Sequence, residues 1–208
     1  SYILGQTTNN SILLRLFRFV DVGHEQSIPT YFSVINILLS SVLLFVIYRY
    51  EKINNNKGWK YWLFLSLLLL FLSVDESIGI HESYAVLYRS LAEQGIITNQ
   101  LEHNQWLPFG ILFIFIVGIS LIPFFRTLSR KTLSYFILSG IVFVTGAIGF
   151  EYLGALMLRK GYGDDDLIYL VRRLFEEGFE MFGIVIFNCA LFHEILKRKI
   201  FLDFSFSK

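Results

Sequence analysis

Five long apolar segments dominate this sequence, and each has about the length needed to cross a lipid bilayer. A membrane-spanning helix requires roughly 20 consecutive apolar residues. The segments cover residues 31–47, 61–80, 107–125, 133–158 and 167–196. Hydrophobic residues make up 54% of the chain and charged residues only 17%, against about 25% charged residues in an ordinary soluble domain. The sequence therefore predicts an all-α integral membrane protein, a bundle of about five transmembrane helices forming one domain over residues 1–208.

Lysine and arginine residues gather in alternate connections between these segments, and this asymmetry predicts the orientation. Such bases are enriched in the short loops on the cytoplasmic side of a membrane. They are Arg49, Lys52, Lys57 and Lys60 after the first segment, Arg126, Arg130 and Lys131 after the third, and Lys197, Arg198 and Lys199 after the fifth. With five spans, we expect the N-terminus outside and the C-terminus in the cytoplasm.

Two shorter amphipathic stretches are expected to form helices along the membrane surface. Residues 12–20 place Arg15 and Arg18 three positions apart, on one face of a possible interfacial helix. Residues 84–93 lie in the longest loop and predict a second short helix on the outer surface. The polar Ser27 followed by Pro29 marks the start of the first span, because proline is tolerated in the first turn of a helix.

Charge and cysteine content narrow the range of partners. A net charge of +1 provides no basic field that would attract nucleic acid, so that class is excluded. The single cysteine, Cys189, lies inside an apolar segment, which excludes an intramolecular disulfide. The expected partners are the lipid bilayer and other membrane subunits.

Acidic residues recur near the outer ends of three spans, and they form the candidate site. Counting about 20 residues outward from the predicted cytoplasmic ends of the second, fourth and fifth spans reaches the neighbourhood of His81, Glu151 and Glu177, respectively. The three helices therefore place their acids at one depth in the membrane. An unpaired ionised carboxylate inside the hydrocarbon costs several kcal/mol, so each acid there must be protonated, paired with a base or bound to a cation. The candidate metal ligands are Asp75, Glu76, His81, Glu82, Glu151, Glu176, Glu177 and Glu180.

Helical geometry limits how these residues could meet. If the second span continued as one helix, Asp75 and Glu82 would share a face, and His81 would need a kink near Gly79 to join them. The alternative is that His81 and Glu82 are interfacial residues in contact with water. In the fifth span, Arg172 lies four residues before Glu176, so part of that acidic run is expected to be neutralised within its own helix.

Other polar residues in the spans have structural interpretations. The glycines of the fourth span, Gly146, Gly149 and Gly154, are expected to lie against neighbouring helices, because small residues let backbones approach closely in a membrane. Asn188 is expected to form a hydrogen bond across helices. Glu194, at the cytoplasmic end of the fifth span, is interpreted as an interfacial residue.

Three functions are compatible with these features. The first is a metal-dependent membrane protein, an enzyme activating water or oxygen being one form of it, because an oxygen-rich cluster with an imidazole suits calcium, magnesium, manganese, iron(II) or zinc. The second is a component of cation- or proton-coupled transport or of a channel. The third is a non-catalytic structural subunit of a larger membrane complex. The sequence contains no glycine-rich phosphate loop, nucleophile elbow or zinc-protease motif that would identify a reaction.

Overall fold

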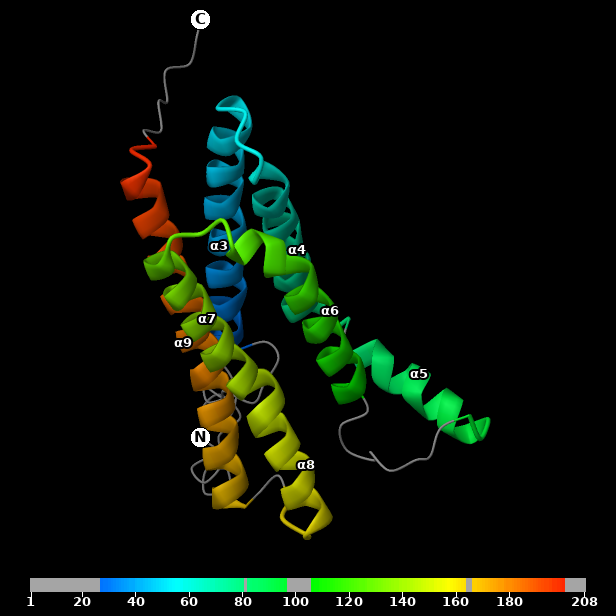
Figure 1. The fold of residues 1–208 in the computed structure, drawn as a ribbon. Coiled ribbons are helices and arrows are strands. Elements are labelled where there is room, and N and C mark those ends of the chain that lie inside the picture. The colour runs from blue at the N-terminus through cyan, green and yellow to red at the C-terminus, as the bar shows by residue number, and fades with distance from the viewer. Residues whose placement is uncertain (1–26, 81, 97–105, 164–165, 201–208) are drawn as a thin grey trace, which may run out of the picture.

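The computed structural model describes residues 27–80, 82–96, 106–163 and 166–200, and these residues form helices joined by short connections (Figure 1). Five helical segments are long and apolar enough to cross a membrane. They are α3 (Ile28–Ile53), α4 (Trp59–Ile78), α6 (Leu107–Phe125), the segment Arg130–Arg159, and α9 (Leu167–Lys197). The five predicted spans are thus confirmed as helices of sufficient length, and α5 (Glu82–Glu93) confirms a helix over all of residues 84–93.

Local sequence signals explain where several helices begin and end. Ser27 caps α3 by accepting a hydrogen bond from the Thr30 backbone N–H at 3.4 Å, with proline in the first turn as predicted. Ser129 caps the fourth span in the same way, through the Thr132 N–H at 3.3 Å. The second span ends earlier than predicted, at Ile78, because Gly79 adopts a left-handed conformation with φ of 64° that terminates the helix.

The fourth span is built from three pieces. It begins as α7 (Arg130–Val144), widens into a π-helical turn, η1 (Thr145–Phe150), and continues as α8 (Glu151–Arg159). A π-helical turn is uncommon and often marks a functional site, because its hydrogen-bond ladder changes register within the helix. Here it lies where the span reaches its acidic residue.

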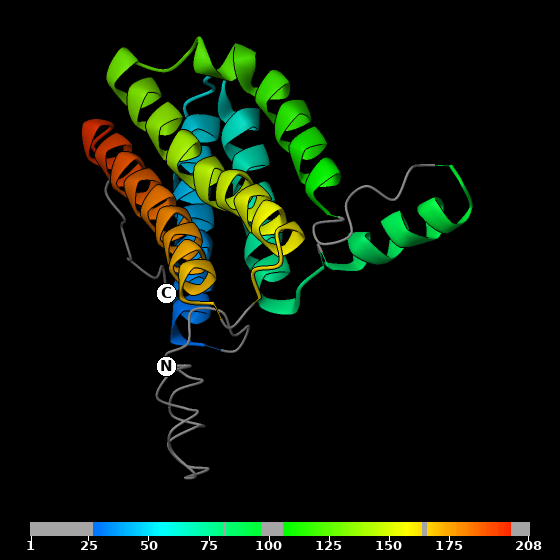
Figure 2. The same cartoon turned by 90° about the horizontal axis from the view of Figure 1, so that it is seen from below.

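The helices run alternately up and down the bundle (Figures 1 and 2). The helix α3 packs extensively against both α4 and α9, while α7 and η1 lie along α9. In both views α5 projects away from the bundle beside the start of α6. The connections 54–58 and 126–129 lie at one end of the bundle, and the connection after α8 lies at the other.

The hydrophobic core lies in the half of the bundle that carries most of the bases. Leu44 and Ile47 of α3, Phe124 of α6 and Leu191 of α9 are fully buried there. The Trp62 ring meets the Phe124 ring edge-on, with centroids 5.0 Å apart. Such aromatic pairs stabilise packing beyond the area they bury, so this half holds the helices together most firmly.

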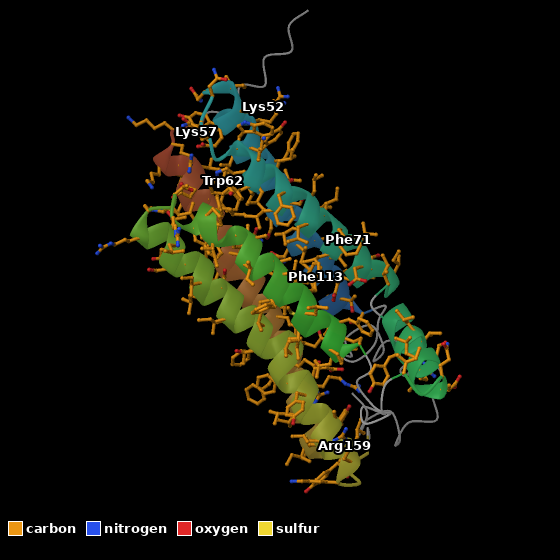
Figure 3. The ribbon with its side chains drawn as sticks, turned by 45° about the vertical axis from the view of Figure 1, so that its right-hand side comes forward. Lys52, Lys57, Trp62, Phe71, Phe113 and Arg159 are labelled. Atoms are coloured by element: carbon orange, nitrogen blue, oxygen red, sulfur yellow. The ribbon has the colours of Figure 1, made fainter. Side chains whose placement is uncertain are left out.

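Large apolar side chains cover the outside of the bundle, and charged groups gather at its ends. Phe115 and Phe182 are 65% and 68% exposed, although each lies within a helix long enough to cross a membrane. Lys52 and Lys57 lie at one end of the bundle and Arg159 at the other (Figure 3). This is the surface pattern of an apolar belt between two polar ends.

The predicted interfacial helix over residues 12–20 lies outside the described residues, as does His81. The predicted shared face of Asp75 and Glu82 is wrong. Gly79 ends α4 before Glu82, which instead begins α5, so the two acids belong to different helices.

Candidate functional site

Carboxylates from three helices lie close enough to interact electrostatically. Glu180 of α9 interacts with Glu76 of α4, with Glu151 of α8 and with its own-helix neighbours Glu176 and Glu177. Glu177 also interacts with Glu76 and Glu151. We call these five residues the carboxylate cluster. Counting along three separate spans therefore leads to residues that the fold brings to one region.

Two arginines of α9 compensate part of this negative charge, because both Arg172 and Arg173 act on Glu177. The Arg172 guanidinium lies 2.5 Å from the Glu176 carboxylate, which is four residues further along α9, as the spacing predicts. The same nitrogen lies 3.9 Å from the Glu151 carboxylate. Glu151 also accepts a hydrogen bond of 3.3 Å from the Trp106 indole N–H, at the start of α6.

The acids of the cluster also act on one another. The Glu176 and Glu151 side chains are within hydrogen-bonding reach of each other. Two carboxyl groups can share a hydrogen bond only when one of them carries a proton, because an ionised carboxylate has acceptors alone. Glu180 interacts with four other carboxylates. The chemistry that this arrangement favours is the binding of protons or cations.

Close packing of the fourth and fifth spans positions Glu180. A methyl group at Gly146 would lie 2.8 Å from the Glu180 Cγ and 2.8 Å from the Glu176 carbonyl oxygen. A side chain at Gly154 would meet the Arg172 guanidinium, at 2.7 Å from Nη1. The predicted helix contacts of Gly146 and Gly154 are confirmed, and both glycines are buried. The same prediction for Gly149 is wrong, since a Cβ there would touch only Thr145 of its own span, at 3.8 Å.

Among the residues that the structure describes, no group of three His, Cys, Asp or Glu side chains has an arrangement that could hold a metal ion. The predicted metal site therefore has no support from this part of the chain. His81 and the side chain of Glu82 lie outside the described part, so their predicted roles as ligands stay predictions.

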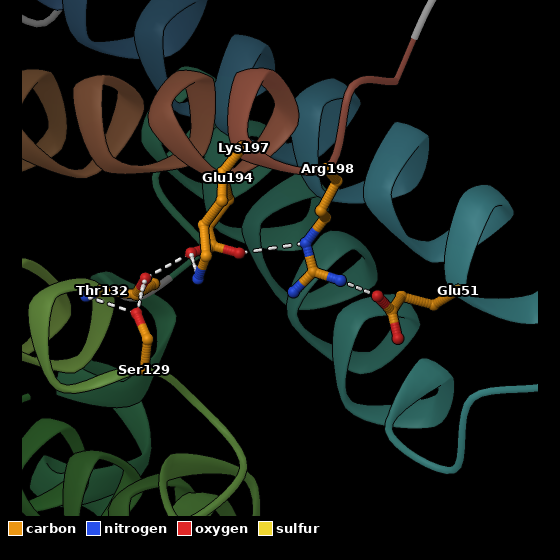
Figure 4. Close-up of polar contacts among 6 residues, drawn as sticks. All are labelled: Glu51, Ser129, Thr132, Glu194, Lys197 and Arg198. Atoms are coloured by element: carbon orange, nitrogen blue, oxygen red, sulfur yellow. Dashed lines mark hydrogen bonds and ion pairs between the residues drawn. The ribbon is translucent and has the colours of Figure 1, made fainter.

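A second polar cluster lies at the opposite, base-rich end of the bundle (Figure 4). Glu194 of α9 is 1% exposed, and its carboxylate accepts a hydrogen bond from the Thr132 hydroxyl at the start of α7. Lys197 and Arg198 approach the same carboxylate at 3.3 Å and 3.0 Å. The interpretation of Glu194 as an interfacial residue is wrong, because the first turn of α7 covers it.

Arg198 extends this cluster to a third helix. Its guanidinium forms an ion pair with Glu51 near the end of α3 (Figure 4) and lies over the Trp62 ring, 5.2 Å from the centroid. Two buried acids are thus matched by two bases, which satisfies the requirement that buried charges be paired. We call Glu51, Thr132, Glu194, Lys197 and Arg198 the basic-end cluster.

Sequence reasoning missed the basic-end cluster. The available signal was Glu51, an acid within a run of lysines and arginines, which has the right charge to pair with a base of another connection.

A third polar contact lies between the two clusters. The Ser40 hydroxyl of α3 donates a hydrogen bond of 2.7 Å to the Asn188 side-chain oxygen of α9. The Asn188 amide donates to the Asn36 carbonyl oxygen at 3.1 Å. The predicted hydrogen bond of Asn188 across helices is confirmed, and it joins α9 to α3.

These observations define a class: over the residues that the structure describes, the chain is a helical bundle with five helices of membrane-spanning length and a carboxylate cluster contributed by three of them. The chain belongs to the family described as domain of unknown function DUF8692, whose model matches residues 3–195. Neither a curated protein nor a solved structure matches the chain.

Proposed function

We propose that this chain is a multipass integral membrane protein, with its N-terminus outside and its C-terminus in the cytoplasm. The apolar belt of exposed side chains supports insertion, because monomeric soluble proteins rarely expose contiguous apolar surface on this scale. The bases at one end support the orientation. Both acids of the basic-end cluster are buried and paired, so the exposed charges among the described residues near that end are basic.

We further propose that the carboxylate cluster takes up and releases protons or monovalent cations, as a component of coupled transport or of a channel. The observation that carries this proposal is the surroundings of Glu180, which interacts with four carboxylates from three helices. Arg172 lies against Glu176 and near Glu151, so it offsets only part of the cluster's charge. Arg173 acts on Glu177 as well, so the cluster has five carboxylates against two arginines. Excess negative charge in an apolar setting is costly, which favours the binding of positive charge, and intramembrane acids commonly form proton relays.

Two other functions stay predictions. A divalent metal ion bound by Asp75, Glu76 or His81 together with the other acids, with or without catalysis, would require ligands that the described residues do not assemble. A non-catalytic subunit role would have the acids locked in salt bridges to arginines, and the contacts of Arg172 with Glu176 and Glu151 are of that kind. Its other basis is the apolar surface, which lipid covers as readily as a partner does.

Ion flux through purified protein in liposomes tests the proposal. Proteoliposomes containing an internal pH dye should acidify faster than empty liposomes under an imposed proton gradient, and Glu180→Gln should abolish the difference. Glu93→Gln is the matched control, because Glu93 lies on the exposed surface of α5, outside the cluster. Proton and sodium flux equal to that of empty liposomes would reject transport.

Stoichiometric metal in the purified protein, lost in Asp75→Asn and Glu180→Gln, would favour the metal function instead.

A further inference from the structure

Arg172 occupies a slot between the fourth and fifth spans. Its side chain is only 8% exposed, which is unusual for a charged group. On one side lies Gly154, where a Cβ would approach the guanidinium carbon to 2.8 Å, so a larger residue there would require the guanidinium to move. On the other side the guanidinium carbon lies 4.7 Å from the Tyr169 ring centroid, within the range of a cation–π interaction.

The guanidinium also reaches the backbone of the fourth span. Arg172 Nη1 donates a hydrogen bond of 2.8 Å to the carbonyl oxygen of Phe150, the last residue of the π-helical turn. In addition, the ring of Phe150 stacks on Phe175, with centroids 6.0 Å apart and an angle of 11° between the planes. Two adjacent parts of α9 therefore hold the same residue of the fourth span.

Phe150 directly precedes α8, so the bond from Arg172 lies at the junction where the hydrogen-bond ladder returns from the π-helical turn to α-helical register. A charged donor from another helix is a strong hydrogen-bond partner for a carbonyl, and in an apolar setting water does not compete for it. The Thr145 hydroxyl also bonds back to the Ile141 carbonyl at 2.7 Å, a contact that bends helices. Gly149, inside the turn, faces only Thr145 of its own span, at 3.8 Å from the position of an added Cβ.

We propose that Arg172 is a positioning residue that fixes α8 against α9 and thereby holds Glu151 in the carboxylate cluster. The importance of the position of Glu151 for transport rests on the proposed function, whereas the attachment of α8 to α9 by Arg172 does not. A simple ion pair between Arg172 and Glu176 would stay within one helix and leave α8 unaffected. The bond to the Phe150 carbonyl and the fit over Gly154 are what connect Arg172 to the fourth span.

Hydrogen–deuterium exchange of the full chain in detergent micelles tests this role. Arg172→Gln should speed exchange of the amides in Thr145–Arg159 by about ten- to a hundredfold, the change expected from losing one charge-assisted hydrogen bond that limits local opening. Glu176→Gln leaves the bond to Phe150 intact, so it should change exchange in the same segment by less than about threefold. Amides of α3 serve as the internal reference.

Gly154→Ala separates attachment from charge. It keeps Arg172 and every acid but fills the slot, so exchange in Thr145–Arg159 should rise as it does in Arg172→Gln. Gly140→Ala is the control, because a Cβ there meets no atom within 4 Å. Wild-type exchange in Gly154→Ala would overturn the proposal, whether or not Arg172→Gln folds. Faster exchange in Gly154→Ala together with liposomes that show no flux would uphold the attachment and reject the proposed transport.

Discussion

Two glycines three residues apart in the fourth span should respond in opposite ways to the same substitution. At Gly146 a methyl group would lie 2.8 Å from the Glu176 carbonyl oxygen and 2.9 Å from the Glu180 backbone nitrogen. Both are backbone atoms, so the helices must separate, and overpacking of this kind costs about 1–3 kcal/mol. Replacing glycine by alanine in a helix contributes about 0.5–1 kcal/mol in the other direction. Gly146→Ala should therefore lower the free energy of unfolding by about 1–2 kcal/mol.

Gly149→Ala provides the contrast, because the added methyl group would touch only the Thr145 methyl group at 3.8 Å, an ordinary van der Waals distance. It should leave stability unchanged or raise it by up to about 1 kcal/mol. Both variants can be unfolded reversibly with SDS in mixed micelles, with tryptophan fluorescence as the readout. Equal stability of the two variants would refute the close contact between the fourth and fifth spans. It would also remove the argument that Glu180 is positioned by that contact.

Three further predictions concern other parts of the bundle. Glu194→Ala should lower the free energy of unfolding by about 2 kcal/mol, which is less than the loss of one partner from a fully buried ion pair because Lys197 and Arg198 are partly exposed. In the same unfolding assay, Lys197→Gln should cost under about 1 kcal/mol. Asn188→Ala should lower the free energy of unfolding by about 1–2 kcal/mol, because it loses the hydrogen bonds to α3. Cys189→Ala, at an exposed neighbouring position, should lower it by under about 0.5 kcal/mol, and equal effects of the two variants would contradict the interhelical bond. In a Cys189→Ala background, a membrane-impermeant thiol reagent applied outside should label a cysteine at Glu93 and miss one at Asn55, and the opposite labelling would reverse the orientation.

The sequence predicts the spans well because membrane-spanning helices depend on length and apolar content, which need no knowledge of the fold. It also predicts the Asn188 bond, since a polar amide in the middle of a span has few partners other than another helix. The apolar pattern predicts that the second span ends at residue 80, two residues beyond the end of α4 at Ile78, because the pattern allows a kink at Gly79 but does not indicate a left-handed helix terminus there. A glycine in an apolar segment gives no direct sign of its φ.

The two clusters show where sequence reasoning stops. Depth counting along each span brings Glu76, Glu151 and Glu180 to one level, but it leaves the rotation of each helix undetermined. Gly149 illustrates this, because its neighbours Gly146 and Gly154 face α9 and it does not. The π-helical turn shifts the register between α7 and α8, and no residue type marks such a turn in advance. The burial of Glu194 depends on the first turn of α7 covering it, which is a property of the packed bundle.

The central claim is that the carboxylate cluster binds positive charge, and infrared spectroscopy of the reconstituted protein in a buffer free of sodium and potassium, where protons are the small cations available, tests it most directly. Protonated carboxyl groups have a C=O stretching band that is separate from the carboxylate bands and shifts in D₂O. The account predicts this band in the wild-type protein at neutral pH, a smaller band in Glu180→Gln, and an unchanged band in Glu93→Gln. A wild-type spectrum without the band, or one that Glu180→Gln leaves unaltered, would contradict the claim.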